Sequence, residues 1–310
     1  MRTARPQVIR RAVHGVLLLD KPLGLSSHDA LYQAKRLYRA DKAGHTGTLD
    51  PLATGLLPLC FGAATKFSQV SLDADKAYRA TLHLGQTRVG GDLEGEVIDE
   101  RPLAFDRAAL DAAVLRLTGA IDQVPPMQSA LKHEGKALYE YARAGIEVER
   151  AARRVTMHRL DIVEWHAERL VIDVVCSKGT YIRTLAQDLG ELLGCGAHLS
   201  ALRRTGSGAL TLEHAVTLEQ LAALDESARD ALLQPADALL QAWPVVRLPD
   251  DEAGRFLSGL RRRVQLSDAP AVRVYGPQER AFLGSAHITS GELIADRLLS
   301  PVEVSGLLEP

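Results

Sequence analysis

Cysteine is scarce in this chain of 310 residues. The three cysteines, Cys60, Cys176 and Cys195, are scattered and form no Cys-x-x-Cys pair, which excludes a disulfide framework. Cys195 and His198 have a spacing that metal sites use, but no second pair supports them, so we expect no metal site. This cysteine usage is typical of the reducing cytoplasm, which is where we expect the protein.

Long apolar runs are also absent. The most apolar segment, residues 52–64, is interrupted by Gly55, Pro58 and Gly62, which argues against a membrane span. Residues 1–11 are basic and lack the apolar stretch of a signal peptide. We therefore expect no membrane association.

Neither sign of charge is in excess, since the formal net charge is −2 and the pI is about 6.6. This balance argues against a protein that coats nucleic acid non-specifically. Composition alone leaves the partner open, because local basic clusters occur and such clusters usually form a solvated face. These clusters are Arg10-Arg11, Lys132 with Lys136, Arg153-Arg154, Arg203-Arg204 and Arg261-Arg262-Arg263.

What is present is enough apolar sequence, 46% of the residues, for a sizeable core and about two domains. Strand and helix patterns alternate irregularly, which favours an α+β core in residues 1–245. Residues 78–84 alternate apolar and polar side chains as a strand does. Further strands are predicted at 16–19 and 170–176, and helices from His28, over 106–117 and over 181–193.

Two segments break this pattern. Residues 125–154 begin with two prolines and mix Lys, His, Gly, Tyr and Arg, which indicates a long excursion from the core. Residues 243–249 have the composition of a linker. Beyond them, strands over 271–275 and 280–288 predict a small, mostly β second domain, residues 246–310.

Asp50 lies in a turn rich in Gly and Thr between apolar segments. On local chemistry alone an Asp that caps a turn is the commoner interpretation, because Asp-Pro often starts turns. The nearby Gly44, Gly47 and Gly55 also allow a tight backbone that holds a carboxylate in a cleft. The order of residues required for a phosphate-binding P-loop is missing.

Other candidates are equally ambiguous by themselves. Arg183, in the first turn of its helix, is either an exposed arginine or the partner of a carboxylate or phosphate. Tyr78 is either a core tyrosine or a ring that stacks on a nucleobase. His45 reads as a turn histidine, and Leu202 as a core residue.

Taken together, however, six segments occur in the order and spacing of a known family. The chain resembles the TruB family of bacterial tRNA pseudouridine-55 synthases over residues 15–205, and the C-terminal part is loosely similar to a PUA RNA-binding domain. The matching segments, with x for an unmatched position, are GVLLLDKPxGxSS at 15–27, GHTGTLDPLATG at 44–55, KAY at 76–78, SALKxxGKALY at 129–139, CSKGTYIR at 176–183 and LRRT at 202–205.

The resemblance implies a pseudouridine synthase fold: a central mixed or antiparallel sheet flanked by helices, with a thumb-like insertion at about 125–154. It implies isomerisation of uridine 55 in the T-loop of tRNA to pseudouridine, without a cofactor. Asp50 would be the nucleophile, Tyr78 would stack on the uracil, and Arg183 would pair with Asp50. A lysine in place of Arg183 would lose the planar fork that fixes such a pair.

The resemblance also implies how the RNA is held. A uridine inside a loop must be flipped out to reach the enclosed carboxylate. His45 would fill the vacated stack, and Tyr181 and Leu202 would line the base pocket. The expected partner is the tRNA T-arm and T-loop, bound by a monomer with no obligate protein partner. Phosphate or substrate contacts are expected from Lys21, Lys132, Lys136, Arg153, Arg154 and Lys178.

One segment departs from the family. After Leu84-Gly85-Gln86, residues 87–91 replace the usual Thr-Asp-Thr-like run, so the resemblance implies no contacts for these residues. Two alternatives also remain open at this point, a guide-dependent synthase subunit and an RNA-folding or RNA-binding protein. A glycosidase is disfavoured, because it requires a second catalytic carboxylate and no partner for Asp50 stands out.

Overall fold

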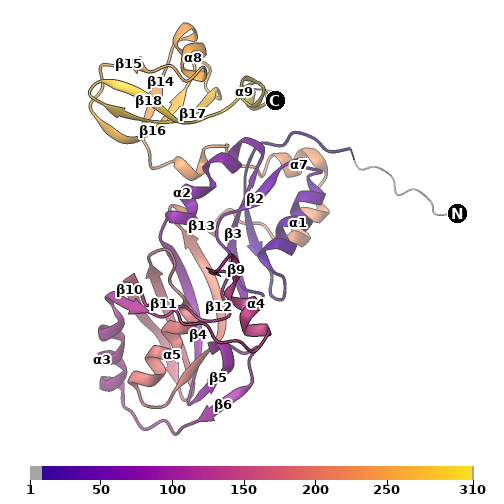
Figure 1. Cartoon of the computed structure of the whole chain (residues 1–310). Helices are drawn as coiled ribbons and strands as arrows, with labels where there is room; N and C mark the ends of the chain where they lie inside the picture. Colours follow the sequence, from indigo (N-terminus) through magenta and orange to yellow (C-terminus); the bar gives the residue numbers. More distant parts are fainter. Residues whose placement is uncertain (1–8, 309–310) are drawn as a thin grey trace, which may run out of the picture. The chain divides into compact units, whose positions relative to one another are not determined.

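The computed structural model describes residues 9–308, and within them the chain forms two compact units (Figure 1). The first unit comprises Met1–Asp50, Leu56–Asp73 and Ala209–Pro310, and the second comprises Pro51–Gly55 and Ala74–Gly208. Part of the basic start of the chain, residues 1–8, and the last two residues of the predicted second domain lie outside the described residues. Each unit is described by itself.

The second unit is built on a mixed sheet. Its antiparallel strands follow the order β12, β4, β11, β10, β7, and the first residues of β3 add a parallel partner to β12. The α+β class and the mixed sheet are thereby confirmed. The strands are β3 Ala53–Phe61, β4 Lys76–Leu84, β7 Gly119–Gln123, β10 Arg153–His166, β11 Arg169–Cys176 and β12 Ala197–Ser207.

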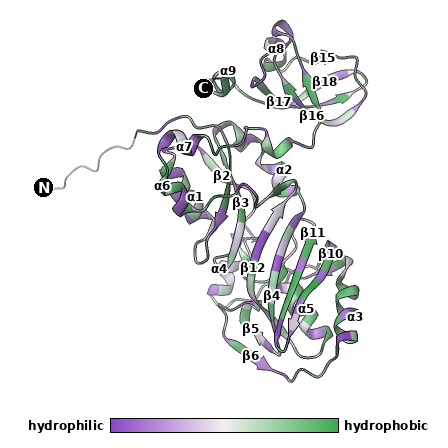
Figure 2. Ribbon diagram, turned by 180° about the vertical axis from the view of Figure 1, so that it is seen from behind, coloured by the Kyte–Doolittle hydropathy of each residue, from purple (hydrophilic) through white to green (hydrophobic). Residues whose placement is uncertain are grey.

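Helices α3 (Arg107–Leu117) and α5 (Ile182–Leu192) cover one face of this sheet. The alternation predicted for β4 is confirmed, since Ala80, Leu82 and Leu84 are buried in the cluster that these helices close. Figure 2 shows that β11 is mostly hydrophobic and that β12 is partly hydrophilic.

Residues 124–152 form one long connection between β7 and β10. The strands on either side pair directly, Gln123 with Arg153, so the chain leaves the sheet and returns at the same point. The connection holds the two-residue strands β8 (Lys132–His133) and β9 (Lys136–Ala137) and the short helix α4 (Leu138–Arg143). A second, smaller excursion after β4 consists of β5 Gln86–Arg88, η2 Val89–Gly91 and β6 Val97–Glu100.

The first unit begins with β1 (Gly15–Lys21) and α1 (Ser27–Leu37), and Ser26 caps the helix. Strand β1 neighbours β3, and β2 pairs with the later part of β3. Thr217 and Gln220 form a capping box at the start of α6. The remaining elements are β2 Ala43–His45, η1 Gly62–Phe67, α2 Ser68–Asp73, β13 Leu210–Thr211, α6 Leu218–Ala223, α7 Glu226–Asp230 and η3 Ala238–Leu240.

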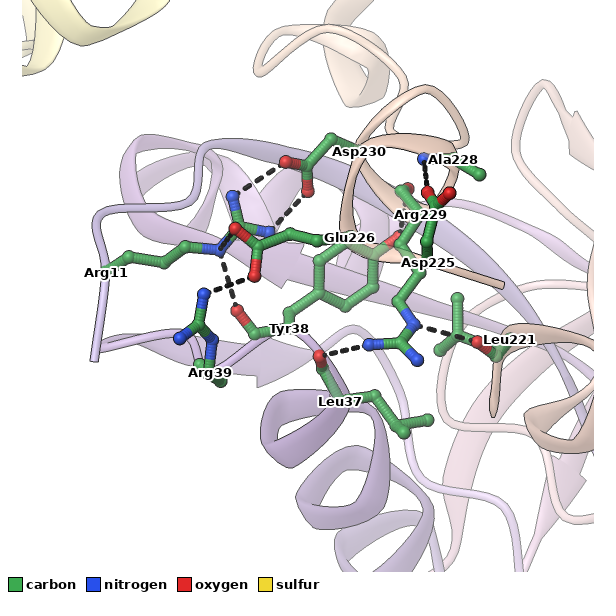
Figure 3. Close-up of polar contacts among 10 residues, drawn as sticks. All are labelled: Arg11, Leu37, Tyr38, Arg39, Leu221, Asp225, Glu226, Ala228, Arg229 and Asp230. Carbon is green, nitrogen blue, oxygen red and sulfur yellow. Dashed lines mark hydrogen bonds and ion pairs between the residues drawn. The ribbon is translucent and has the colours of Figure 1, made fainter. Parts of the chain in front are cut away.

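Polar contacts join the start of this unit to α7 (Figure 3). The Arg11 guanidinium donates to both carboxylate oxygens of Asp230, at 2.7 and 2.5 Å. The buried Tyr38 donates its hydroxyl to the carbonyl of Arg229, at 2.6 Å. Arg229 in turn donates to the carbonyl of Leu37, at 2.9 Å. The end of α1 is thus fixed to a helix nearly two hundred residues later in the chain.

The C-terminal residues of the first unit form a mostly β module, as predicted. Its strand order is β14, β16, β17, β18, β15, and Phe282 packs on Phe67 with ring centroids 5.2 Å apart. The predicted linker at 243–249 is wrong in part, because β14 pairs in parallel with β16 there. The elements are β14 Val245–Arg247, α8 Asp250–Leu257, β15 Arg262–Arg263, β16 Ala269–Tyr275, β17 Phe282–Thr289, β18 Glu292–Leu298 and α9 Pro301–Leu308.

The buried residues of this module continue one hydrophobic cluster that also contains Val16, Leu56 and Phe67. The boundary between residues 245 and 246 stays a prediction. Among residues 9–308, no helix has both the length and the apolar character needed to cross a membrane.

Candidate active site

Asp50 lies in the turn between β2 and β3, and this turn is anchored immediately before it. The buried Ser27 hydroxyl accepts a hydrogen bond from the Leu49 amide (2.7 Å) and donates one to the Leu49 carbonyl (3.0 Å). Leu49 is itself buried, while Asp50 is exposed. The sequence therefore fixes the backbone of the turn immediately before an exposed Asp50.

A second anchor lies at the other end of the turn. The buried Thr46 donates its amide to the Pro58 carbonyl at 3.1 Å, and its hydroxyl accepts from Ser71 at 2.9 Å. Between the anchors Gly47 has φ +89°, a conformation that favours glycine. The interpretation of Asp50 as part of a tight, fixed backbone is thus supported within the first unit.

Lys21 and His45 are the other predicted residues of the first unit. Lys21 ends β1 and is fully buried, and its ammonium donates to the carbonyls of Pro22 (2.9 Å) and Leu25 (2.6 Å). These contacts hold the loop that leads into α1. His45 is the half-buried last residue of β2, two residues before the glycine of the Asp50 turn.

In the second unit, Tyr78 and Leu202 lie on neighbouring strands. Tyr78 on β4 pairs in register with Arg204 on β12, and Leu202 pairs with Ala80. Leu202 also pairs with Ala53 at the start of β3. Both Tyr78 and Leu202 are half-buried, so each presents part of its apolar surface to solvent.

Tyr181 is held at the start of α5 by a side chain from another strand. No side chain caps this helix. Instead the buried Gln123 amide accepts from the Tyr181 amide at 3.1 Å and donates to the Tyr181 carbonyl at 3.4 Å. Gln123 was missed by the sequence analysis, and its position at the end of a strand gave no signal.

Arg183 is buried, which excludes its interpretation as an exposed helix arginine. Its guanidinium donates to the carbonyls of Gln128 (2.8 Å) and Gly90 (3.5 Å) and lies 3.4 Å from the Asp92 carboxylate. Asp92 is also buried. The structure therefore gives Arg183 a fixed direction and a carboxylate partner that the sequence analysis did not assign.

The altered segment 87–91 supplies part of this support. Gly90 and Gly91 both have φ +79°, and a Cβ on Gly91 would come within 2.9 Å of the Gln187 side chain on α5. The segment thus folds closely against the helix that carries Arg183, and the Gly90 carbonyl accepts from that arginine. A role of these residues in RNA binding stays untested.

Arg204 was predicted as part of a solvated basic cluster, and this prediction is wrong. Only 1% of its surface is exposed, and its side chain hydrogen-bonds with that of Tyr78. Burial lowers the pKa of the Arg204 guanidinium, while the contact with Tyr78 acts in the opposite direction. The strand period contained the signal, because Arg203 and Arg204 must point to opposite faces of the sheet.

The remaining predicted cations are exposed. Lys178 lies in the loop before α5, and Lys132 lies in the 124–152 connection. This connection also carries two cation–aromatic pairs, Lys136 over Tyr141 at 5.0 Å and Arg143 over Tyr139 at 5.3 Å. Exposed cations beside aromatic rings suit a polyanion with unstacked bases.

The predicted site residues divide between the units. Asp50, His45 and Lys21 belong to the first, and Tyr78, Tyr181, Arg183 and Leu202 belong to the second. The pairing of Asp50 with Arg183 stays a prediction. In the described part of the chain, no three His, Cys, Asp or Glu side chains gather as metal ligands would, and Cys195 and His198 are both buried.

Comparison with solved structures identifies the fold first. Solved structures of an archaeal box H/ACA sRNP Nop10-Cbf5 complex and of a Cbf5-Nop10-Gar1 complex share this fold, with TM-scores of 0.68 and 0.71. The first is 23% identical in sequence and the match covers 93% of this chain; the second is 24% identical and the match covers 94% of this chain. In both cases the match covers 86% of the other protein's chain. This likeness shows the fold alone.

The family follows from closer matches. Residues 35–182 match the N-terminal domain of the TruB family pseudouridylate synthases, residues 183–241 the tRNA pseudouridylate synthase B C-terminal domain, and residues 244–299 the C-terminal region of pseudouridine synthase II TruB. The chain belongs to the TruB family.

Two relatives illustrate the similarity, and both are named tRNA pseudouridine synthase B. The relative from Cupriavidus metallidurans is 60% identical over 307 residues, which cover 96% of this chain and 98% of that protein. The relative from Burkholderia lata is 59% identical over 301 residues, which cover 95% of this chain and 93% of that protein.

Proposed function

We propose that the protein isomerises uridine 55 in the T-loop of tRNA to pseudouridine, with Asp50 as the nucleophile and without a cofactor. As a member of the TruB family, it is a tRNA pseudouridine synthase. The observation that carries this function is an identity of about 60% over nearly the whole chain to relatives with that name.

The anchored turn supports the role of Asp50. A nucleophile divides glycosidic bond cleavage into easier steps only if it meets the substrate at a fixed angle. The bonds from Ser27 to Leu49 fix the backbone immediately before Asp50. Asp50 is an exposed residue, and a flipped nucleotide would reach it there.

The second unit supplies groups suited to a nucleobase. Tyr78, Tyr181 and Leu202 offer partly exposed apolar surface to the uracil, and stacking on an aromatic ring tolerates its rotation. Arg183 supplies a cation for Asp50, since an opposite charge keeps a carboxylate ionised. Asp92, the observed partner of Arg183, holds that guanidinium in place.

The 124–152 connection is proposed to close on the T-arm. Lys132, Lys136, Arg153 and Arg154 are exposed on it or at its end and would neutralise phosphates. His45 would fill the stack that the flipped uridine leaves. Lys178, beside α5, would add a further phosphate contact. Lys21 is buried and bonded to the carbonyls of Pro22 and Leu25, so its part in substrate binding would be to hold the loop before α1.

The location and assembly of the enzyme belong to the same proposal. Its substrate and its three unpaired cysteines fit the cytoplasm. We propose a monomer that needs no guide RNA or protein partner. Pseudouridine formation in naked tRNA by the purified chain supports this, whereas a strict need for a further component favours the guide-dependent alternative.

The proposed nucleophile is tested by tritium release from a tRNA transcript labelled at C5 of uridine. Asp50→Asn should abolish release, because the amide is a far weaker nucleophile, while Asp111→Asn is a control for an exposed carboxylate on α3. Release by Asp50→Asn at the rate of the parent protein would remove Asp50 as the nucleophile.

A further inference from the structure

Arg204 is the buried cation beside Tyr78. It lies on β12 directly opposite Tyr78 on β4, and only 1% of its surface is exposed. The arginines next to it differ, because Arg203 is half-buried and Arg79 is exposed and paired with Asp173 at 2.7 Å. An arginine is almost never fully buried unless it is paired.

The backbone of Arg204 is fixed from both sides. Tyr78 pairs with it across the antiparallel ladder, and Gly55 pairs with it in parallel. Gly55 has φ +98°, and a Cβ there would lie 2.3 Å from the Arg204 carbonyl oxygen. Strands β3 and β4, on either side of β12, therefore approach it closely and hold the backbone from which the Arg204 side chain starts.

The direction of the hydrogen bond follows from the chemistry of the pair. A guanidinium has donors and no acceptor, so the phenol oxygen of Tyr78 accepts from Arg204. The Tyr78 proton must then point away from Arg204. The guanidinium also places a positive charge, removed from solvent, beside that oxygen.

We propose that Arg204 is a positioning residue that acts through Tyr78: it orients the phenol and stabilises negative charge on its oxygen while the C5 proton of the rotated uracil is removed. This inference rests on the proposed function. In that step the C5–H bond breaks and its electron pair stays in the ring. The proton passes to the Tyr78 oxygen, which has given its own proton to water.

The test measures single-turnover tritium release and tRNA binding for Arg204→Lys, Arg204→Met, Tyr78→Phe and the Tyr78→Phe/Arg204→Lys double variant. Arg204→Met should lower the rate about 100-fold and leave the tRNA dissociation constant within about twofold. Arg204→Lys should be faster than Arg204→Met, because it keeps the charge. The double variant should be no slower than Tyr78→Phe alone.

Arg79→Met on the exposed face is the matched control and should keep the parent rate, and thermal melting checks folding of every variant. Effects of Tyr78→Phe and Arg204→Lys that multiply would overturn the inference, as would equal rates for Arg204→Lys and the parent. If tritium release by Tyr78→Phe is too slow to measure, the rates of Arg204→Lys and Arg204→Met are compared instead. Equal rates for these two variants contradict the proposed role of Arg204. A parent protein that releases no tritium instead contradicts the proposed function.

Discussion

At the scale of single residues, the Asp50 turn depends on a few short side chains. Ser27 alone makes both hydrogen bonds to Leu49, and its neighbour Ser26 performs a separate task, as the cap of α1. Two adjacent serines thus allow loss of the turn anchor to be compared with loss of a helix cap.

Ser27→Ala should destabilise the protein by about 1–3 kcal/mol, because it leaves a buried amide and a buried carbonyl of Leu49 without this partner. It should also slow tritium release while tRNA binding changes little, since the freed turn holds Asp50 less well. Ser26→Ala should cost about 1 kcal/mol and keep the rate. Equal rates for the two variants would show that the anchor does not serve catalysis.

The cysteines illustrate how burial controls reactivity. Burial raises the pKa of the Cys60 thiol to about 12 and that of Cys176 to about 11, and it also raises the pKa of Cys195. At pH 8 these thiols stay protonated, and only the thiolate reacts. A thiol reagent should label the native protein slowly and all three cysteines rapidly in denaturant. Rapid labelling of the native protein would contradict the buried placement.

At the scale of elements, α5 starts without a cap of its own and depends on Gln123 from β7. Gln123→Ala should cost about 1–3 kcal/mol, since the Tyr181 amide loses a buried acceptor. Thermal unfolding measures this loss. The exposed Gln69→Ala provides the control and should change stability by less than about 0.5 kcal/mol. Similar melting temperatures for the two variants would refute the anchoring role.

Local signals predicted many of the elements correctly. The helical pattern over 106–117 marks α3 and the alternation along 78–84 marks β4, because each pattern is complete within a few residues. Strand β14 was taken for a linker because its stability comes from pairing with β16, which lies well beyond it in the sequence.

Dependence on partners that are distant in the sequence also explains which site residues were missed. Asp92 and Gln123 act on partners in α5 or just before it, and nothing beside them in the sequence points to those partners. Arg204 was misinterpreted because it directly follows Arg203 in the sequence, and two adjacent arginines suggested a basic surface. Asp50, Tyr78 and Arg183 were selected by their order along the chain in a known family, whereas their local patterns were ambiguous.

At the scale of the whole molecule, the near-neutral net charge requires that RNA binding come from local surfaces. If phosphate contacts dominate, the logarithm of the tRNA affinity should fall linearly with the logarithm of salt concentration. Neutralising Lys132, Lys136, Arg153 and Arg154 together should reduce that slope by about 3, at roughly 0.7 for each phosphate contact with single-stranded nucleic acid.

The control for this experiment neutralises Arg107 and Arg159, two exposed arginines paired with acidic neighbours in the second unit. Their loss should leave the slope nearly unchanged. An affinity independent of salt, or an equal change in both variants, would show that the 124–152 connection does not supply the phosphate contacts.

The central claim is that this chain alone uses Asp50 to modify one uridine of tRNA. The most direct measurement maps pseudouridine by chemical adduct formation and primer extension in a full tRNA transcript incubated with the purified protein. We expect one new stop at position 55 with the parent protein and none with Asp50→Asn. Modification at another position, or an undiminished stop with Asp50→Asn, would contradict it.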